Sequence, residues 1–279
     1  MTRAPSRLAP RQVWRDGRAE TGVRAVPEET AIAFVFDHSA EAVMMATPSD
    51  LEDFAYGFAL NEAIVAAPAD IVQLEIIDLP LGIEVRMRLA APRSDDLKRR
   101  RRHRAGPVGC GLCGVEGLED ALRAPPPVNA VLRVSPAEII AGMSALAARQ
   151  PLHEATRAVH AAGFLKPGAG LVCVREDVGR HNALDKLAGA LARADVDARA
   201  GVVVMTSRVS VELVQKAARM GAPILAAISA PTSLALRMAD ESGMTIVGIV
   251  RNDGLEVFTH AARIDDAERN HVAKADDER

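Results

Sequence analysis

The second half of the sequence alternates short apolar runs with amphipathic segments, and this alternation constrains the fold more than any other feature. The apolar runs predict strands at 171–176, 201–206, 224–228 and 245–250. Helical periodicity predicts helices at 136–149, 153–162, 183–194, 211–220 and 234–242. Because strands buried on both faces read as nearly continuous apolar runs, the pattern predicts a parallel or mixed sheet with helices on both faces. We therefore expect an α/β fold.

The first half has a different pattern, which is typical of an α+β lobe. It predicts strands at 30–36, 43–45, 72–77 and 83–89, with an amphipathic helix beginning at Leu51. Between the halves, a basic run, several glycines and three consecutive prolines indicate a loop or linker. The expected organisation is a flexible tail at 1–24, the α+β lobe at 25–97, the loop or linker at 98–127, an α/β ligand-binding domain at 128–265 and a polar tail at 266–279.

Composition excludes several classes of protein. The chain has 279 residues, enough to bury a core without disulfides, and three cysteines are too few for a disulfide framework. Aromatic residues make up only 3% and the formal net charge is −3, so we expect no nucleic-acid partner. There is no signal-peptide pattern and no apolar stretch long enough to span a bilayer, so we expect a cytoplasmic protein with no membrane partner.

The segment Cys110-Gly111-Leu112-Cys113 is the strongest chemical signal. As half of a zinc site it would need two more ligands, but the third cysteine, Cys173, stands alone on a predicted strand. A thioredoxin-like pair sits at a rigid helix start, whereas glycines flank both cysteines here. The glycines at 109, 111 and 114 also match a dinucleotide fingerprint, but no strand precedes them.

Among the functional interpretations, these cysteines favour a mobile sulfur carrier over a zinc site, a redox pair or a dinucleotide fingerprint. A persulfide needs reach and exposure, and exchange at sulfur depends on thiolate character. The basic run at 98–104 would favour the anionic thiolate and persulfide, although such a run is also typical of a solvated loop. A loop with incidental thiols remains the alternative.

Polar side chains follow several predicted strands, and ligands in such sheets bind at the carboxyl ends of strands. Arg180, His181 and Asn182 stand at a predicted helix start, where they could hold a phosphate or a heterocycle. Ser207 and Arg208 follow the next strand and suggest anion binding. The alternative for both groups is helix capping with local salt bridges.

Four motifs in this order resemble one known family. They are ATPSDLEDFAYGF from residue 46, CGLCG from 110, REDVGRHNALDK from 175 and TSRVSVELVQKAARMGAPILAAISAPTSLA from 206. Together they resemble the FdhD family of formate dehydrogenase accessory sulfurtransferases over about residues 28–263. The resemblance implies a mixed sheet like that of cytidine deaminases, with a mobile cysteine-containing loop and a homodimeric assembly. The apolar face of the helix from Leu51 could supply the interface of that dimer or belong to the core, since periodicity does not separate the two.

The resemblance also implies a reaction. Such proteins take sulfur from a cysteine desulfurase, hold it as a persulfide and pass it to the molybdenum bis-(molybdopterin guanine dinucleotide) cofactor, which is destined for formate dehydrogenase. That cofactor would be a bound substrate, and no permanently bound metal is expected. The persulfide would form on Cys110, with Cys113 as the second cysteine of the motif. The family's cofactor-contact segment corresponds to Ile249, Val250, Arg251, Asn252, Asp253 and Gly254.

One segment departs from the family pattern. Where the family usually has Thr-Gly-Gly-Val-His, this chain has residues 156–160, Thr-Arg-Ala-Val-His, so the histidine remains and both glycines are lost. If those glycines let the backbone approach the cofactor, the ligand geometry at His160 differs here. Taken alone, His160 would be a core histidine.

Two other functions remain open. A zinc-dependent nucleobase deaminase needs H-x-E and P-C-x-x-C, but Ala162 replaces the glutamate after His160 and Gly109 replaces the proline. A non-catalytic molybdenum-cofactor chaperone would bind the guanine dinucleotide without carrying sulfur. Cys173, on a strand predicted to be buried, is expected to be a small core residue.

Overall fold

The computed structural model describes residues 3–91, 93–94 and 123–265. The two cysteines at 110 and 113, the basic run at 98–104 and the predicted tail at 266–279 therefore lie outside the described residues. The chain divides into two compact units, and their segments interleave along the sequence. Unit 1 comprises 1–123, 150–161 and 175–195, and unit 2 comprises 124–149, 162–174 and 196–279. This differs from the expected linear order, because two segments assigned to the second domain belong to unit 1.

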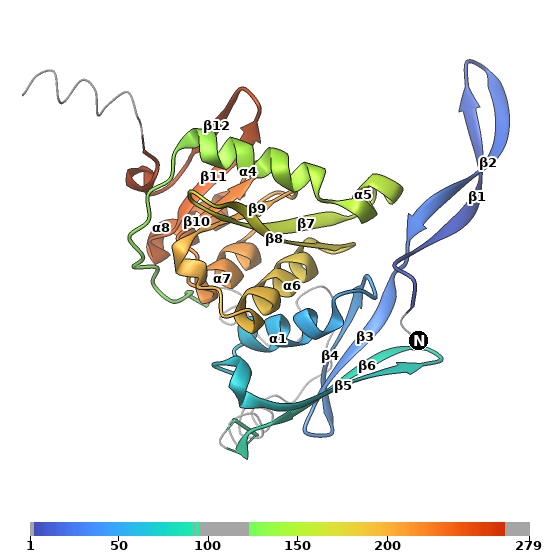
Figure 1. Ribbon diagram of the computed structural model, residues 1–279, viewed down its shortest axis with the longest axis horizontal. Helices are drawn as coiled ribbons and strands as arrows, with labels where there is room; N and C mark the ends of the chain where they lie inside the picture. The colour runs from blue at the N-terminus through green and yellow to red at the C-terminus, as the bar shows by residue number, and fades with distance from the viewer. Residues whose placement is uncertain (1–2, 92, 95–122, 266–279) are drawn as a thin grey trace, which may run out of the picture. The chain divides into compact units, whose positions relative to one another are not determined.

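Unit 1 is built on a four-stranded sheet with the order β4-β3-β6-β5. Its strands are β3 (Thr30–Phe36), β4 (Ser39–Ala46), β5 (Ile71–Leu79) and β6 (Gly82–Leu89). β3 pairs parallel with β6 and antiparallel with β4, while β5 pairs antiparallel with β6. The helix α1 (Leu51–Asn61) covers one face of this sheet (Figure 1), where Phe34 stacks on Phe58 with ring centroids 4.3 Å apart. The strands and the helix predicted for this half are confirmed.

The helices α1 and α6 (Arg180–Arg193) cross with their backbones in close contact. A Cβ atom at Gly57 would lie 1.7 Å from the carbonyl oxygen of Asp185, and one at Gly189 would lie 1.9 Å from that of Asp53. Only glycine allows this approach at either position. Because α1 is buried against both the sheet and α6, its apolar face belongs to the core of unit 1, which decides between the two alternatives that periodicity left open.

The first residues of unit 1 form an antiparallel ribbon, where the sequence suggested a flexible tail at 1–24. β1 (Ser6–Arg15) pairs along its whole length with β2 (Arg18–Pro27). The turn between them is Asp16-Gly17, with φ of 50° and 75°. Both values lie in the left-handed region that two-residue hairpin turns require, and Asp-Gly is a favoured pair for them. That dipeptide was the hairpin signal in the sequence.

Unit 2 contains most of a six-stranded sheet with the order β12-β11-β10-β9-β7-β8. Its strands are β7 (His160–Lys166), β8 (Gly170–Asp177), β9 (Val202–Met205), β10 (Ile224–Ala227), β11 (Thr245–Arg251) and β12 (Gly254–Val257). β9, β10 and β11 are parallel, and the flanking β7 and β12 are antiparallel to their neighbours. The start of β7 and the end of β8 fall in unit 1.

Helices cover both faces of this sheet, as the sequence predicted. α4 (Pro136–Ala148) lies on one face, and α7 (Val211–Arg219) and α8 (Ser233–Ser242) lie on the other (Figure 1). A Ser135–Glu138 capping box starts α4. The α/β class is therefore confirmed. Three short 3-10 helices span Pro68–Asp70, Ala198–Ala200 and Ala261–Arg263.

Two local predictions are wrong. The predicted helix at 153–162 is interrupted, since α5 (Pro151–Thr156) ends at Arg157 with φ 59° and β7 starts at His160. Burial of Ala161 and the neighbouring apolar residues in the sheet outweighs their helical propensity. Cys173 is half-buried rather than a core residue, because β8 is an edge strand of its sheet. No helix in the described part of the chain is both long and apolar enough to cross a membrane.

Candidate functional site

Polar residues gather at the carboxyl ends of the three parallel strands of unit 2. Arg208 follows β9, Ser229 follows β10, and Arg251 ends β11. Backbone contacts hold these strand ends together: Val209 forms a parallel bridge with Pro231, and the amide of Ile249 donates to the carbonyl of Ser229 at 3.3 Å. This carboxyl edge is the position at which open α/β sheets bind ligands.

The two arginines of the carboxyl edge are both exposed. Nη1 of Arg251 donates to the carbonyl oxygens of Ile228 and Val250, which fixes the guanidinium at the end of β11. The described part of the chain offers no hydrogen-bond partner to Nε or Nη2 of Arg251, so these donors are available for an anion. Ser207 differs, because its hydroxyl is buried and donates to the carbonyl of Arg208 at 2.9 Å.

The predicted contact segment 249–254 forms a strained bulge followed by a turn. Ile249 has φ 50°, which is unusual for a β-branched residue, and the register with β12 shifts between Gly248 and Arg251. A residue held in such a conformation costs about 1–3 kcal/mol and is found most often where function requires it. Asn252 and Asp253 form the exposed turn into β12. Val250 is buried, and Gly254 is half-buried.

The other predicted group stands at the start of α6 in unit 1. The helix N-cap is Gly179, which has no side chain to accept from the first-turn amides. Nε of Arg180 is buried and has no hydrogen-bond partner among the described residues. Asn182 is buried, and its Nδ2 donates to the Met45 carbonyl and to Asp177 Oδ1, both at 2.9 Å. His181 beside it is half-buried. The side-chain amide nitrogen of Asn182 therefore has its hydrogen-bond partners inside unit 1.

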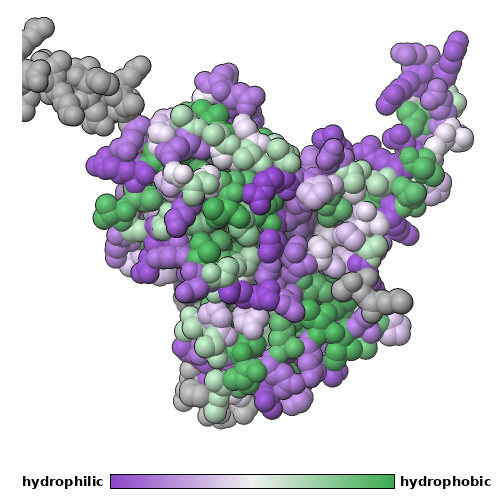
Figure 2. All heavy atoms as spheres, viewed as in Figure 1, coloured by the Kyte–Doolittle hydropathy of each residue, from purple (hydrophilic) through white to green (hydrophobic). Residues whose placement is uncertain are grey.

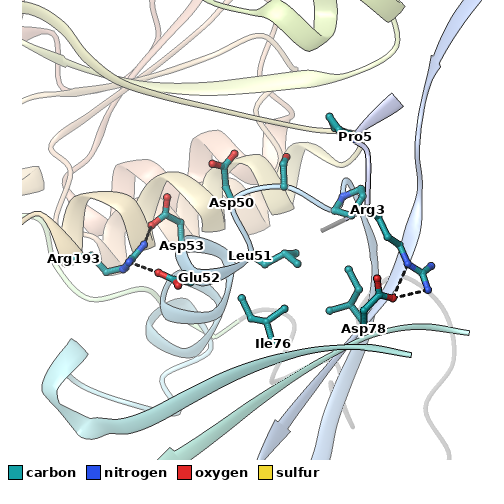
Figure 3. Close-up of a pocket in the computed structure, with 12 residues that line it drawn as sticks. Arg3, Pro5, Asp50, Leu51, Glu52, Asp53, Ile76, Asp78 and Arg193 are labelled. Carbon is teal, nitrogen blue, oxygen red and sulfur yellow. Dashed lines mark hydrogen bonds and ion pairs between the residues drawn. The ribbon is translucent and has the colours of Figure 1, made fainter. Parts of the chain in front are cut away.

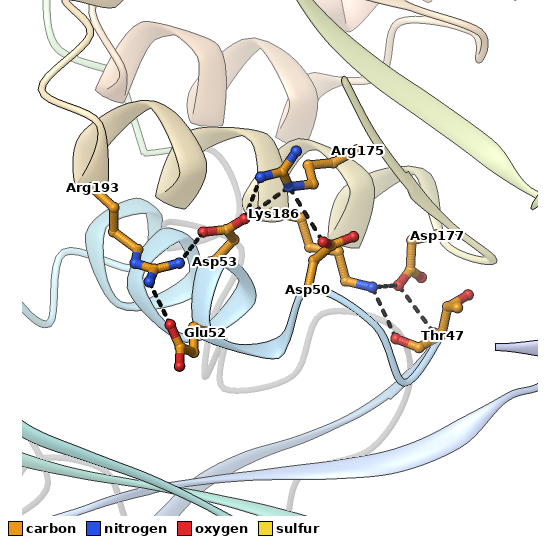
Figure 4. A network of polar contacts seen from close by, with 8 residues as sticks. All are labelled: Thr47, Asp50, Glu52, Asp53, Arg175, Asp177, Lys186 and Arg193. Carbon is orange, nitrogen blue, oxygen red and sulfur yellow. Dashed lines mark hydrogen bonds and ion pairs between the residues drawn. The ribbon is translucent and has the colours of Figure 1, made fainter. Parts of the chain in front are cut away.

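A buried ion pair lies directly below this helix start (Figure 4). Lys186 and Asp177 are both fully buried, with 2.7 Å between Nζ and Oδ2. Asp177 also accepts from the amides of Thr47 and Gly179, at 3.0 and 2.8 Å. Nζ of Lys186 donates to the Thr47 carbonyl at 2.9 Å. The pair thus joins the loop before α1 to the end of β8 and to α6.

A second network of ion pairs connects α1 with β8 and α6 (Figure 4). Asp53 is buried and pairs with Nη2 of Arg175 at 2.6 Å and with Nη1 of Arg193 at 2.5 Å. Arg193 also pairs with Glu52, and its pKa is raised, chiefly by the hydrogen bond to Asp53. Three charged residues of the motif from 175 to 186 are therefore bonded to residues of the ATPSDLEDF motif, namely Arg175, Asp177 and Lys186. The sequence could not show this, because the partners are more than a hundred residues apart.

His160 lies close to Arg180 and His153 in unit 1. Burial lowers the pKa of His160, and the positive charges of Arg180 and His153 lower it further, while Asp177 opposes the shift. This environment therefore favours the neutral form of the His160 imidazole. Glu176 accepts from the amides of Leu152 and His153, at 2.9 and 2.8 Å, and so caps α5.

Unit 1 also has a pocket of about 610 Å³ beside the start of α1 (Figure 3). Its lining mixes charged side chains with apolar ones such as Leu51 and Ile76. The charged groups are largely bonded to one another: Arg3 pairs with Asp78, and Arg193 pairs with Glu52 and Asp53. Within the described residues, no group of three or more His, Cys, Asp or Glu side chains is arranged to hold a metal ion.

Sequence comparisons agree with the resemblance seen in the motifs. Residues 27–265 match the FdhD/NarQ family. A relative from Agrobacterium fabrum, named sulfur carrier protein FdhD, is 51% identical over 262 residues, which cover 94% of this chain and 97% of the relative. The protein of the same name from Brucella abortus is 50% identical over 242 residues, covering 86% of this chain and 90% of the relative.

A solved structure is also similar. The crystal structure of a proposed formate dehydrogenase accessory protein from Desulfotalea psychrophila aligns with a TM-score of 0.72 at 26% identity, covering 94% of this chain and all of that chain. Fold, motif order and sequence identity thus lead to one assignment. The chain belongs to the FdhD/NarQ family.

Proposed function

We propose that this protein is a sulfur carrier that serves formate dehydrogenase. The proposal takes its first support from the relatives, which are named sulfur carrier proteins and are 46–51% identical over most of the chain. In this proposal Cys110 accepts sulfur from a cysteine desulfurase and holds it as a persulfide. The sulfur then passes to the molybdenum bis-(molybdopterin guanine dinucleotide) cofactor, which the protein binds as a substrate in the cytoplasm.

The strongest structural support for the proposal is the carboxyl edge of unit 2, which is suited to binding the guanine dinucleotide. A guanine dinucleotide presents pyrophosphate oxygens, and guanidinium groups match the geometry of such oxygens. Arg208 and Arg251 are exposed at the ends of the two parallel strands that flank β10, and the Ile249 bulge and the Asn252-Asp253 turn border the same edge. These residues fit a phosphate-bearing heterocyclic substrate. We assign the substrate to this edge.

The sulfur chemistry can be written with balanced atoms. The Cys110 thiolate attacks the outer sulfur of the donor persulfide, a new S–S bond forms on Cys110, and the donor cysteine leaves as a thiolate. For release, the Cys113 thiolate attacks Sγ of Cys110. The outer sulfur leaves as sulfide for the molybdenum, and a Cys110–Cys113 disulfide remains. A thiol reductant returns both cysteines to thiols.

The three cysteines offer a matched test of this sequence of steps. Radiolabelled sulfur would be supplied by a cysteine desulfurase, and both its retention on the protein and the maturation of formate dehydrogenase would be measured. Cys110→Ala should abolish both readouts. Cys113→Ala should still load sulfur but deliver it slowly. Cys173→Ala, the control on the edge strand β8, should leave both unchanged.

The Cys110→Ala variant also distinguishes a sulfur carrier from a cofactor chaperone, once its binding of the guanine dinucleotide is measured as well. A chaperone requires that Cys110→Ala still binds the guanine dinucleotide and still supports maturation. A sulfur carrier requires that binding survives while maturation fails. If Cys110→Ala retains full maturation, the sulfur-carrier proposal is wrong. If Cys113→Ala delivers sulfur at the normal rate, only the release step is wrong.

A further inference from the structure

The ribbon formed by β1 and β2 has two chemically different faces. In the β1–β2 register, side chains of paired residues share a face, and neighbours along a strand alternate between faces. One face is largely apolar and is called the apolar face. It carries Leu8, Pro10, Gln12, Trp14, Ala19, Thr21, Val23 and Ala25. The opposite face, called the arginine face, carries Arg7, Arg11, Arg15, Arg18 and Arg24.

The apolar face is uncovered in the single chain. Leu8, Trp14 and Val23 are 71%, 70% and 62% exposed. The base of the ribbon contacts α5, where Arg24 donates to the Thr156 carbonyl at 3.1 Å, and the rest extends away from the four-stranded sheet of unit 1 (Figure 1). Figure 2 shows apolar side chains along the ribbon, interleaved with the hydrophilic ones. An isolated two-stranded ribbon is at best marginally stable in water, so these apolar side chains indicate a surface that covers them.

The charges of the arginine face are available to a partner. All five arginines are exposed. Three of them form no ion pair with any described residue, namely Arg11, Arg15 and Arg18. Residues 6–27 contain five arginines and two acidic residues, whereas the whole chain has a net charge of −3. The ribbon is therefore a basic element on an otherwise acidic chain, and its charge favours an anionic partner.

An anionic lipid surface fits both faces of the ribbon. Elements that lie in a membrane interface carry arginine on one face and tryptophan or leucine on the other, and the apolar face enters about 5–10 Å into the boundary between headgroups and acyl chains. Tryptophan rings concentrate at this depth, which suits Trp14. With the backbone at headgroup level, the arginines of the opposite face lie within the Debye length of the lipid phosphates, about 8–10 Å. A nucleic acid would engage the arginines but leave Leu8 and Val23 in water.

We propose that the β1–β2 ribbon attaches the protein to the surface of an anionic phospholipid membrane. The apolar face lies among the headgroups and the upper acyl chains, and the arginine face holds lipid phosphates. The remainder of the chain carries the acidic excess, so the same surface repels it and the ribbon makes the contact. Such a contact needs no spanning helix, and an apolar stretch long enough to cross a bilayer is therefore not its sequence signal. This inference is independent of the proposed sulfur chemistry.

Trp14 gives a direct test, since it is the only tryptophan of the chain. The full-length protein would be titrated with vesicles of phosphatidylcholine alone and with vesicles of equal parts phosphatidylcholine and phosphatidylglycerol, and followed by co-sedimentation and fluorescence. With the mixed vesicles we expect binding, a blue shift of the Trp14 emission and protection from acrylamide. Binding to phosphatidylcholine alone should be at least about tenfold weaker, and added salt should weaken binding to the mixed vesicles.

Several results of this titration would overturn the proposal. One is that the protein binds neither kind of vesicle, and another is that it binds both equally. A blue shift of Trp14 that develops with protein concentration in the absence of vesicles would assign the apolar face to a second copy of the chain. Protection of Trp14 by polyglutamate or by a duplex oligonucleotide, but not by vesicles, would assign the ribbon to a different polyanion.

Variants of the apolar face test its part in the contact. Val23→Asp should weaken binding to the mixed vesicles at least about tenfold, because it removes buried apolar area and adds a negative charge. Leu8→Asp is a second variant of the same face. Val131→Asp, at a residue 97% exposed and outside the ribbon, adds the same charge and should bind like the wild type. Circular dichroism and the unfolding midpoint would check folding. Wild-type binding in both ribbon variants would contradict the proposal.

Variants of the arginine face test the charge. Each arginine close to an anionic lipid surface strengthens binding roughly fivefold, so Arg11→Gln combined with Arg18→Gln should weaken binding to the mixed vesicles about 25-fold. The double variant should also depend less on salt than the wild type. Arg237→Gln, at an exposed arginine of α8, should bind like the wild type. If the double variant and Arg237→Gln weaken binding equally, the ribbon is not the lipid-binding element.

Discussion

The buried network of unit 1 and the carboxyl edge of unit 2 are both rich in charged groups but use them differently. In unit 1, Lys186, Asp177 and Asp53 are buried and bonded to one another or to neighbouring groups. In unit 2, Arg208 and Arg251 are exposed, and Arg251 keeps donors available. The first arrangement stabilises a helix junction, and the second is suited to binding. A dense polar motif is therefore not by itself a binding site.

Removing the buried lysine should have the largest effect. Lys186→Met leaves Asp177 buried without its cation, which should lower the free energy of unfolding by about 3–5 kcal/mol. Denaturant titration would measure the change. The matched control is Asp197→Asn, which breaks the exposed Asp197–Arg199 pair and should cost less than about 1 kcal/mol. Equal effects of the two variants would contradict a structural role for the buried network.

The second largest loss of stability is expected from a substitution where α1 and α6 cross. Gly189→Ala puts a methyl group 1.9 Å from the Asp53 carbonyl, so the helices must separate, at a cost of about 1–3 kcal/mol or more. The control is Gly22→Ala on the ribbon, where a Cβ meets nothing within 4 Å. Thermal unfolding would compare the two. A stable Gly189→Ala protein would show that the two helices are not in close contact.

The smallest expected effect is the contribution of His160 to the pH dependence of folding stability. Because its folded-state pKa lies below the ordinary 6.5, the unfolded chain binds this proton more readily. Stability is then fully present above pH 6.5 and is lost as the pH falls through 6.5 toward the folded-state pKa. His160→Gln should lose less stability between pH 8 and 5.5 than the wild type. His38→Asn, at an exposed histidine, should keep the wild-type slope. If stability changes equally with pH in the wild type and in both variants, the lowered pKa of His160 is refuted.

Much of the fold could be predicted from the sequence because burial leaves a local pattern. The apolar runs at 201–206 and 224–228 contain the parallel strands β9 and β10, which are buried on both faces. The strand β7 was missed because it contains Ala161, Ala162 and Gly163, which have low strand propensity. Its position depends on pairing with β9, which lies some forty residues later. The ribbon was missed because its Asp-Gly turn was not recognised.

At the candidate site, even less could be predicted from the sequence, because the roles of the charged residues depend on distant partners. Spacing identified the strand ends that carry Arg208 and Arg251, since a carboxyl edge follows from parallel strands. Spacing could not distinguish Arg251, which is exposed, from Lys186, which is buried against Asp177. The roles of these two charges depend on partners distant in sequence. Only the three-dimensional structure shows them.

The central claim is that the carboxyl edge of unit 2 binds the guanine dinucleotide, and one binding measurement tests it directly. Calorimetric titration with guanosine diphosphate as the probe would compare the wild type with Arg251→Ala and with Arg237→Ala, a control at an exposed arginine of α8. Loss of a charged hydrogen bond predicts about tenfold weaker binding for Arg251→Ala, with unchanged folding and with wild-type affinity for Arg237→Ala. Wild-type affinity in Arg251→Ala would contradict the account.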